Sequence, residues 1–294
     1  MAGEPASGKS VLCYRWAIDV MRAGKRAVLL DEEAGPRDAL GKFVALGASA
    51  ELLKDKLTYL EPGGRNLDRL TAEFHALVSS GEVGVVVVDS LGAALAIAGR
   101  SENDNGEVGA FLTSVILPLA ERYGVAVLLI DHKTKGDVSR YSRGASVKLQ
   151  LTGVQLNVVA VRPFSKGQNG QLVVECNKNR FGDYAQGDQW TVDVLTGKDK
   201  ITLDVSERTE AQEFEAFVSS DQTRAVARVY RDSYPAPVAL RNLEIPGLAR
   251  DKARTIAYQL RAKGVLEYST DSDKSPLRWV SDQTVLELPV GIPS

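Results

Sequence analysis

A run of valines, VGVVVVDS at residues 83–90, limits the fold more than any other segment of the sequence. Its side chains are apolar on both faces of an extended chain, whereas a half-exposed hairpin would alternate apolar and polar residues. VAVLLIDH at 125–132 repeats the pattern. Both segments therefore predict strands of a mostly parallel sheet that is covered by helices on both sides.

The order of the remaining patterns supports the same architecture. Shorter apolar segments at 26–31 and 56–60 predict further strands. Helical patterns separate the strands, at 9–23, 37–54, 66–80 with Asn66 as its cap, and a helix that ends near residue 123. Alternating strands and helices are typical of a doubly wound α/β sheet. A chain of 294 residues that is 44% hydrophobic can bury a large core in one or two domains.

The pattern changes in the second half of the chain. Strand-like segments separated by short turns predict an antiparallel extension of the sheet; they span 154–164, 171–180, 189–194 and 200–205. We place a domain boundary at 207/208 and a tail at 286–294. Between them, helices at 210–219, 221–232, 238–243 and 250–263 precede two short strands. Helices followed by a hairpin predict a small winged-helix domain at 208–285.

The chain opens with MAGEPASGKS, which satisfies the phosphate-loop pattern G-x-x-x-x-G-K-[ST]. Glycines let the backbone point several N–H groups at phosphate oxygens, and the following helix adds the positive end of its dipole. Lys9 is expected to reach the outer phosphates and Ser10 to supply a hydroxyl to Mg²⁺. The residues expected to contact the nucleotide are Gly3, Glu4, Pro5, Ala6, Ser7, Gly8, Lys9, Ser10 and Val11.

A phosphate loop normally follows a buried strand, and here Met1 and Ala2 alone precede Gly3. These two residues are too few for the usual strand, so we expect the first strand to be missing. The other motifs are intact, which argues against a decayed site. The expectation is that the natural protein begins further upstream.

Two acidic positions complete the expected nucleotide site. Asp89 ends the valine strand, where it can hold Mg²⁺ directly or through water; the alternative is a cap for the next helix. No glutamate follows Asp89, so a residue that activates water must come from elsewhere. Glu32 and Glu33, just past the strand at 26–31, are the candidates, and a solvated acidic loop is the alternative.

Six segments taken in order carry a family resemblance: GEPASGKS, DEEAGP, VVVVDS, VLLIDHKTK, RGASVKLQ and KNRFG. Over about residues 3–185 they resemble RecA-like ATPases of the replicative-helicase type. More narrowly, they are similar to the AAA-type ATPase modules of actinobacteria and their phages, which are often linked to primases. The resemblance implies ATP and Mg²⁺ as cofactors, DNA as a partner, and a homo-oligomer, by resemblance a hexamer, with a possible primase partner.

The resemblance also implies roles for single residues. Glu33 would be the catalytic glutamate, because Pro36 places it in an E-x-x-P pattern, with Glu32 as second choice. His132 resembles a sensor of the γ-phosphate. Lys178 and Arg180 resemble cations that reach the nucleotide of the next subunit and offset charge in the transition state, as an arginine finger does.

Two basic segments are expected to contact DNA. The first lies where RecA-like proteins place a DNA-contacting loop and contains Lys133, Lys135, Arg140, Arg143 and Lys148. The second is the helix at 250–263, with Arg250, Lys252 and Arg254, in the position of a recognition helix. The alternatives are a solvated loop for the first segment and a protein contact for the second.

These features favour an ATP-hydrolysing DNA motor or helicase-like ATPase of replication or recombination. The alternative is a DNA-bound ATP switch, a loader or regulator that reads duplex DNA with the winged helix. A small-molecule kinase is disfavoured because no acceptor site is recognisable. The net charge of −2 excludes a uniformly basic nucleic-acid coat. No membrane span or signal layout is present, so we expect a cytoplasmic protein of a bacterium or phage-infected cell.

Overall fold

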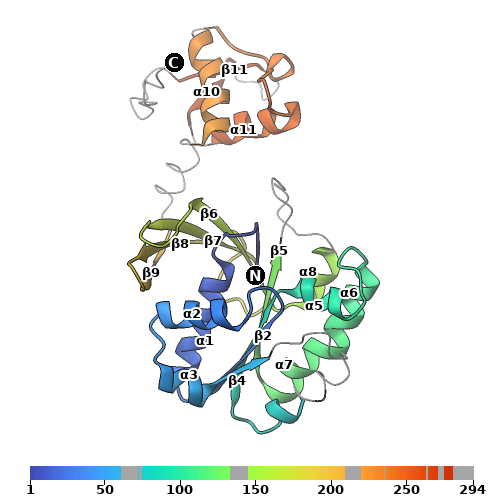
Figure 1. Cartoon of the computed structure of the whole chain (residues 1–294). Coiled ribbons are helices and arrows are strands. Elements are labelled where there is room, and N and C mark those ends of the chain that lie inside the picture. Colours follow the sequence, from blue (N-terminus) through green and yellow to red (C-terminus); the bar gives the residue numbers. More distant parts are fainter. Residues whose placement is uncertain are drawn as a thin grey trace. The chain divides into compact units, whose positions relative to one another are not determined.

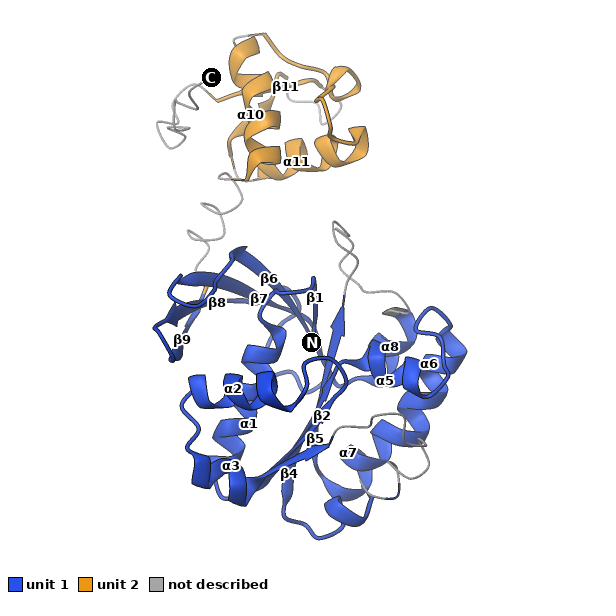
Figure 2. Cartoon of the chain, viewed as in Figure 1, with its two compact units in different colours: residues 1–207 blue, residues 208–294 orange. Residues whose placement is uncertain are grey.

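The computed structural model describes residues 1–60, 72, 75–132, 145–208, 220–234, 236–262, 264–270 and 275–280. The chain divides into two compact units, Met1–Glu207 and Arg208–Ser294 (Figure 2). None of the described helices is long and apolar enough to cross a bilayer. The predicted helices at 66–80 and 210–219 fall largely or wholly outside the described residues.

Unit 1 is built on a sheet whose described strands run in the order β3-β2-β4-β5-β1-β6-β7-β8-β9 (Figure 1). The strands from β3 to β6 are parallel, and β7, β8 and β9 continue the sheet in antiparallel pairing. Their bounds are β1 Ala2–Gly3, β2 Arg26–Asp31, β3 Leu57–Leu60, β4 Val83–Asp89, β5 Ala126–His132, β6 Val154–Arg162, β7 Gly170–Asn179, β8 Gln189–Thr196 and β9 Ile201–Glu207. The predicted doubly wound sheet with an antiparallel extension is confirmed.

Helices pack on both faces of the parallel strands (Figure 1). One layer contains α1 Lys9–Arg22, α2 Pro36–Ala45 and α3 Ala50–Lys56; the other contains α5 Leu91–Ile97, α6 Asn105–Phe111, the π-helical η1 Leu112–Ile116 and α7 Leu117–Tyr123. A further helix, α8 Ala145–Leu151, precedes β6. Helix α6 begins at Asn105, because the Asp104 carboxylate accepts hydrogen bonds from the N–H groups of Gly106 and Glu107 and so caps the helix there.

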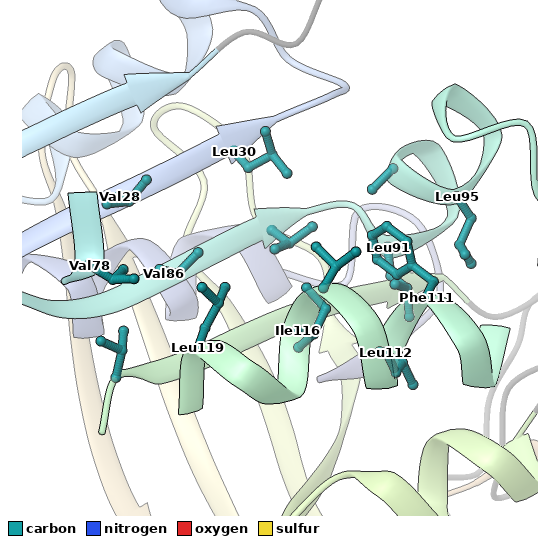
Figure 3. Close-up of a cluster of buried hydrophobic side chains, with 14 of the residues drawn as sticks. Val28, Leu30, Val78, Val86, Leu91, Leu95, Phe111, Leu112, Ile116 and Leu119 are labelled. Carbon is teal, nitrogen blue, oxygen red and sulfur yellow. The ribbon is translucent and has the colours of Figure 1, made fainter. Parts of the chain in front are cut away.

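The alternation of side chains along β2 and β4 explains why two layers are needed. Figure 3 shows Val28, Leu30 and Val86 packed with α5, η1 and α7 on one face. Their neighbours Leu29 and Val87 point to the opposite face, where they contact the layer of α1 and α2. Successive strand residues face opposite sides, so a strand that is apolar at every position is stable only between two apolar layers.

The strand in front of the phosphate loop is present, which corrects the expectation that it is missing. β1 contains Ala2 and Gly3, which pair in parallel with Asp131 and His132 of β5 on one side and with β6 on the other. Ala2 is 2% exposed. Gly3 permits the close approach to β6, because a Cβ atom there would lie 2.4 Å from the Val158 carbonyl oxygen. The strands on both sides provide the hydrogen-bond partners of these residues.

Unit 2 is a small helical domain with its own apolar core. It contains α10 Asp221–Ser233, the 3₁₀ turn η2 Leu240–Asn242, α11 Arg250–Ala262 and an antiparallel pair of strands, β10 Leu266–Tyr268 and β11 Leu277–Trp279. Val238 forms an isolated bridge with Leu277 of β11. Tyr230, Leu260 and Leu277 are fully buried, so α10, α11 and the hairpin share one core.

Candidate functional site: a phosphate loop beside two carboxylates

The segment between β1 and α1 has the geometry of an anion-binding loop. Gly8 caps α1 in a left-handed conformation (φ +89°), which an L side chain adopts only with strain. A Cβ at Gly8 would also come within 2.6 Å of Leu172. Helix α1 starts at Lys9, so the free N–H groups of its first turn and its positive end face the loop. This arrangement suits a phosphate group.

Lys9 lies inside the loop and is 3% exposed. Its Nζ donates hydrogen bonds to the carbonyl oxygens of Gly3 (3.0 Å) and Glu4 (2.7 Å) and to Ser7 Oγ (3.4 Å). Burial lowers the pKa of Lys9 to about 8, and the nearby carboxylates of Asp89 and Glu33 partly offset that effect. The ammonium is therefore mostly protonated at neutral pH and lies where an anion on the loop would meet it.

The carboxylate of Asp89 lies at the carboxyl end of β4, directly against α1. It is 2% exposed and accepts hydrogen bonds from Tyr14 Oη (3.0 Å) and from Ser10. Burial raises the pKa of Asp89, and these hydrogen bonds act in the opposite direction. Tyr14 in turn stacks on Phe43 of α2, with ring centroids 4.6 Å apart. Ser10 and Asp89 are thus joined by a hydrogen bond beside the loop.

The described residues contain no group of three or more His, Cys, Asp or Glu side chains that could hold a metal by themselves. A hydroxyl and one carboxylate beside a phosphate loop fit Mg²⁺ nevertheless, since this ion commonly binds through one or two protein ligands, substrate phosphates and water. Ser10 and Asp89 are the residues that would hold it.

Glu33 projects from the loop that follows β2 toward the end of β4. Ser90 Oγ donates a hydrogen bond to Glu33 Oε1, and His132 Nε2 lies 2.9 Å from Oε1 and 3.2 Å from Oε2. The hydrogen bond with His132, helped by that from Ser90, lowers the pKa of Glu33 to about 2. Asp31 holds the start of this loop, because its Oδ1 accepts hydrogen bonds from the N–H groups of Glu33 (3.1 Å) and Ala34 (2.9 Å).

Glu32 has different surroundings. It borders a small apolar cavity with Leu30, Val88 and Ile97, and burial raises its pKa to about 7, with the Asp31 charge as a second cause. Glu33, by contrast, contacts residues at the ends of β4 and β5 and is ionised at neutral pH.

Lys178 and Arg180 lie at the end of α8. Lys178 Nζ donates to the carbonyl oxygens of Leu149 and Thr152, the latter at 2.7 Å, and the Arg180 guanidinium donates to that of Gln150. Both cations thus satisfy carbonyl groups that a helix leaves free at its C-terminus. The sequence pattern gave no signal for this role. Neither side chain joins the contacts around Glu33 within one chain.

Lys148 is not available to DNA, which corrects its place among the expected DNA contacts. It is 6% exposed, and its Nζ donates to both carboxylate oxygens of Asp131, at 3.0 and 2.9 Å. A lysine on a helix can face the core when a nearby carboxylate neutralises its charge. The other cations expected in this segment, Lys133, Lys135, Arg140 and Arg143, lie outside the described residues.

In unit 2, Arg250 and Arg254 lie on the exposed side of α11, opposite its buried residues such as Ile256. Arg250 donates to the Arg241 carbonyl oxygen at 2.8 Å and lies 3.3 Å from the Glu244 carboxylate. Arg254 lies 4.0 Å from Asp251. Exposed pairs of this kind contribute little to stability.

Two further residues with buried contacts at this edge of the sheet were not predicted from the sequence. Tyr14 follows Ser10 by four residues, so both lie on one face of α1 and both reach Asp89. The four-residue spacing in the sequence could have identified Tyr14 as a second contact of Asp89. Asp131 is the residue before the last one of β5. It pairs with Ala2 of β1 and binds Lys148, and the apolar strand pattern around it gave no signal for this role.

The sheet order, the loop and the carboxylate at the end of β4 define a P-loop α/β protein of RecA-like fold. Residues 1–138 match a family model described as an AAA domain. The chain is similar to the DNA repair and recombination protein RadB of Methanoculleus marisnigri, with 33% identity over 136 residues, which are 44% of this chain and 58% of that protein. RadB of Methanococcoides burtonii is 29% identical over 88 residues, 30% of this chain and 38% of that protein. In each case the match spans less than two thirds of the relative, and together these findings support a RecA-like P-loop ATPase.

The contact between His132 and Glu33 predicts a measurable pKa change. In a His132→Ala variant the pKa of Glu33 should rise from about 2 toward the ordinary glutamate value of about 4.3. A carboxyl group with a lowered folded-state pKa contributes stability above its unfolded pKa and loses it as pH falls toward 2, so the variant should lose less stability in that range. Titration of the ¹³C-labelled Glu33 carboxyl by NMR measures the shift.

The matched control is His75→Ala, which removes the other histidine, a residue that contacts Tyr123 and is absent from the site. The Glu33 pKa should be the same in this variant as in the unchanged protein. An unaltered Glu33 pKa in His132→Ala would show that the imidazole does not hold the carboxylate.

Proposed function

We propose that this protein is an ATP-hydrolysing DNA motor or helicase-like ATPase that acts in recombination, repair or replication. The observation that carries the proposal is the convergence of Lys9, Ser10 and Asp89 on the space in front of the α1 N-terminus. A cation, a hydroxyl and a buried carboxylate at the start of a helix are the groups that a nucleoside triphosphate with Mg²⁺ requires.

In this proposal different residues bind the phosphates and the magnesium ion. The loop N–H groups and the start of α1 take the phosphates, and Lys9 exchanges the carbonyl oxygens of Gly3 and Glu4 for outer phosphate oxygens. Ser10 and Asp89 hold Mg²⁺, and Tyr14 orients the Asp89 carboxylate through its hydroxyl. The ion, when bound, neutralises part of the phosphate charge.

Glu33 is the proposed water-orienting residue. Its carboxylate is ionised at neutral pH and 41% exposed, so it can accept a hydrogen bond from an attacking water molecule. A pKa of about 2 makes it a weak base, which suits orienting water more than removing its proton outright. His132 contacts the same carboxylate from the end of β5, so a change at β5 would alter how Glu33 is held.

Lys178 and Arg180 are proposed to act on the nucleotide of a neighbouring subunit. Within one chain both are directed to the end of α8 and away from the contacts of Glu33. An assembly, by family resemblance a hexamer, would be needed to bring them to a phosphate. We also propose a primase as a partner and the cytoplasm as the location.

Two observations support DNA as the partner. The relatives RadB are named as DNA repair and recombination proteins. Unit 2 has the order helix, turn, helix and hairpin of the proposed winged helix, with Arg250 and Arg254 exposed on α11 and Lys252 between them. Lys133, Lys135, Arg140 and Arg143 are proposed to contact single-stranded DNA.

The first test of the nucleotide site is Lys9→Ala. Affinity for ATP with Mg²⁺ should fall roughly 100-fold, because hydrogen bonds to charged groups contribute about 1.5–3 kcal/mol each. Isothermal titration calorimetry measures the change. Lys54→Ala, which removes an exposed lysine of α3, is the control and should leave affinity unchanged. Equal affinity in Lys9→Ala and the unchanged protein would remove the site assignment.

The second test separates the two glutamates. Glu33→Gln should lower ATP turnover by about 10²–10⁴-fold while ATP affinity stays nearly constant, because the amide keeps the shape of the side chain and loses its charge. Glu32→Gln should retain turnover. The opposite pattern, with Glu32→Gln inactive, would exchange the two roles.

The third test separates a motor from a switch. ATP turnover should rise when single-stranded DNA is added, because a motor couples hydrolysis to movement along the strand. Steady-state phosphate release with and without single-stranded DNA measures this, with duplex of the same sequence as the comparison. Slow turnover that ignores single strands, together with sequence-specific duplex binding, would favour the DNA-bound ATP switch instead.

A further inference from the structure

The main chain around Glu33 is held by hydrogen bonds from consecutive N–H groups. The N–H of Glu32 donates to the Asp89 carbonyl oxygen at 2.7 Å, which continues the pairing of β2 with β4. The N–H groups of Glu33 and Ala34 then donate to Asp31 Oδ1, at 3.1 and 2.9 Å. The Asp31 carboxylate thus takes over as acceptor where the strand pairing ends, and it sets the position of the Glu33 peptide.

The Asp31 carboxylate is itself fixed by partners on both oxygens. Asp31 is 3% exposed, so these partners replace the water that a carboxylate would bind at the surface. Oδ1 accepts the two main-chain hydrogen bonds, and Oδ2 accepts a hydrogen bond from Tyr59 Oη at 2.8 Å. Hydrogen bonds to an ionised acceptor are stronger than those between neutral groups. With Oδ2 held by Tyr59, Oδ1 is directed at the turn that contains Glu33.

Tyr59 reaches Asp31 from the neighbouring strand. In the register of β3 with β2, Tyr59 lies opposite Leu29, and Asp31 follows Leu29 by two residues on the same face of the sheet. The Tyr59 ring packs with the core beneath α1 and α2, so its hydroxyl has a defined position. Because β3 is the last described strand on this side of the sheet, the contact joins the sheet edge to the loop of Glu33.

The carboxylate end of Glu33 has separate contacts. Ser90 Oγ donates to it from the end of β4, and His132 Nε2 lies 2.9 Å from Oε1 at the end of β5. Glu33 is therefore held at its main chain by Asp31 and at its side chain by these two residues. Placement of this kind matters for a group that orients a reactant, because a displacement of about 1 Å can lower a rate about 100-fold.

We propose that Asp31 and Tyr59 are positioning residues for Glu33: Asp31 holds the Glu33 peptide, and the Tyr59 hydroxyl holds Asp31. The inference rests on the proposed function, in which Glu33 orients the attacking water, and it adds a contribution from the edge strand β3. ATP turnover should then depend on a hydroxyl in β3, whereas ATP binding, which the proposal assigns to other residues, should not.

The Glu33 pKa tests the positioning without nucleotide. Tyr59→Phe removes the hydroxyl and keeps the ring in the core. The Glu33 pKa should rise from about 2, because a looser turn weakens the contacts with His132 and Ser90, and it should rise further in Asp31→Ala. The direction is diagnostic, since loss of the Asp31 negative charge by itself would lower the Glu33 pKa. Titration of the ¹³C-labelled Glu33 carboxyl by NMR measures it.

Two matched variants serve as controls. Asp31→Asn keeps an oxygen that can accept from the turn and places an amide group that can donate to the Tyr59 hydroxyl, so the Glu33 pKa should stay near 2. Tyr123→Phe also removes one tyrosine hydroxyl, which lies 3.2 Å from His75 Nδ1, and should leave the Glu33 pKa unchanged. Circular dichroism verifies that all four variants fold.

Steady-state phosphate release and calorimetric ATP titration test the consequence for the proposed reaction. Turnover should fall about 10–100-fold in Asp31→Ala and about two- to tenfold in Tyr59→Phe, where one hydrogen bond to the positioning residue is lost. ATP affinity should stay the same in both. Asp31→Asn and Tyr123→Phe should retain turnover.

Three results would overturn the proposal. One is a Glu33 pKa that is unchanged in both Tyr59→Phe and Asp31→Ala. Another is the same Glu33 pKa in Asp31→Asn as in Asp31→Ala, which would assign the effect to charge. The third is undiminished turnover in both Tyr59→Phe and Asp31→Ala. Absence of ATP turnover in the unchanged protein would instead count against the proposed function, and the Glu33 pKa values would still decide whether Asp31 and Tyr59 hold Glu33.

Discussion

The burial of β4 on both faces is the constraint on which the rest of unit 1 depends. Its valines contact the layer of α1 and α2 on one side and the layer of α5 and α7 on the other, so neither layer can be removed without exposing the strand. The same burial places Asp89, the last residue of β4, at the sheet edge where α1 begins. The position of the carboxylate beside Ser10 is thus a consequence of core packing.

Charged groups are buried at this edge only where each has a specific partner. Lys9 has the loop carbonyl groups, Asp89 has Tyr14 and Ser10, and Lys148 has Asp131. Removing the hydration water from an ion costs several kcal/mol. Each of these charged groups is therefore stable in the interior only because its hydrogen-bond partners replace that water. In the proposed function, a phosphate at the loop would exchange one set of Lys9 partners for another and would not have to bring a solvated cation into the core.

β1 sets the position of the loop that follows it. Ala2 and Gly3 have hydrogen-bond partners in β5 and β6, and this pairing places Gly3 against β6. The loop therefore starts at the same edge of the sheet as Asp89 and His132, at the carboxyl ends of the parallel strands.

The sequence by itself determined the sheet class, the loop and the Asp89 position, because residues 83–90 are apolar at every position and the G-x-x-x-x-G-K-[ST] spacing is local. The tertiary structure alone decided which contacts distant residues make. It joined Glu33, Ser90 and His132 across three strand ends, and it turned Lys148 inward to Asp131 against the expectation of a DNA contact. It also showed that Ala2 and Gly3 form a strand, which local pattern could not predict because their hydrogen-bond partners lie more than a hundred residues away.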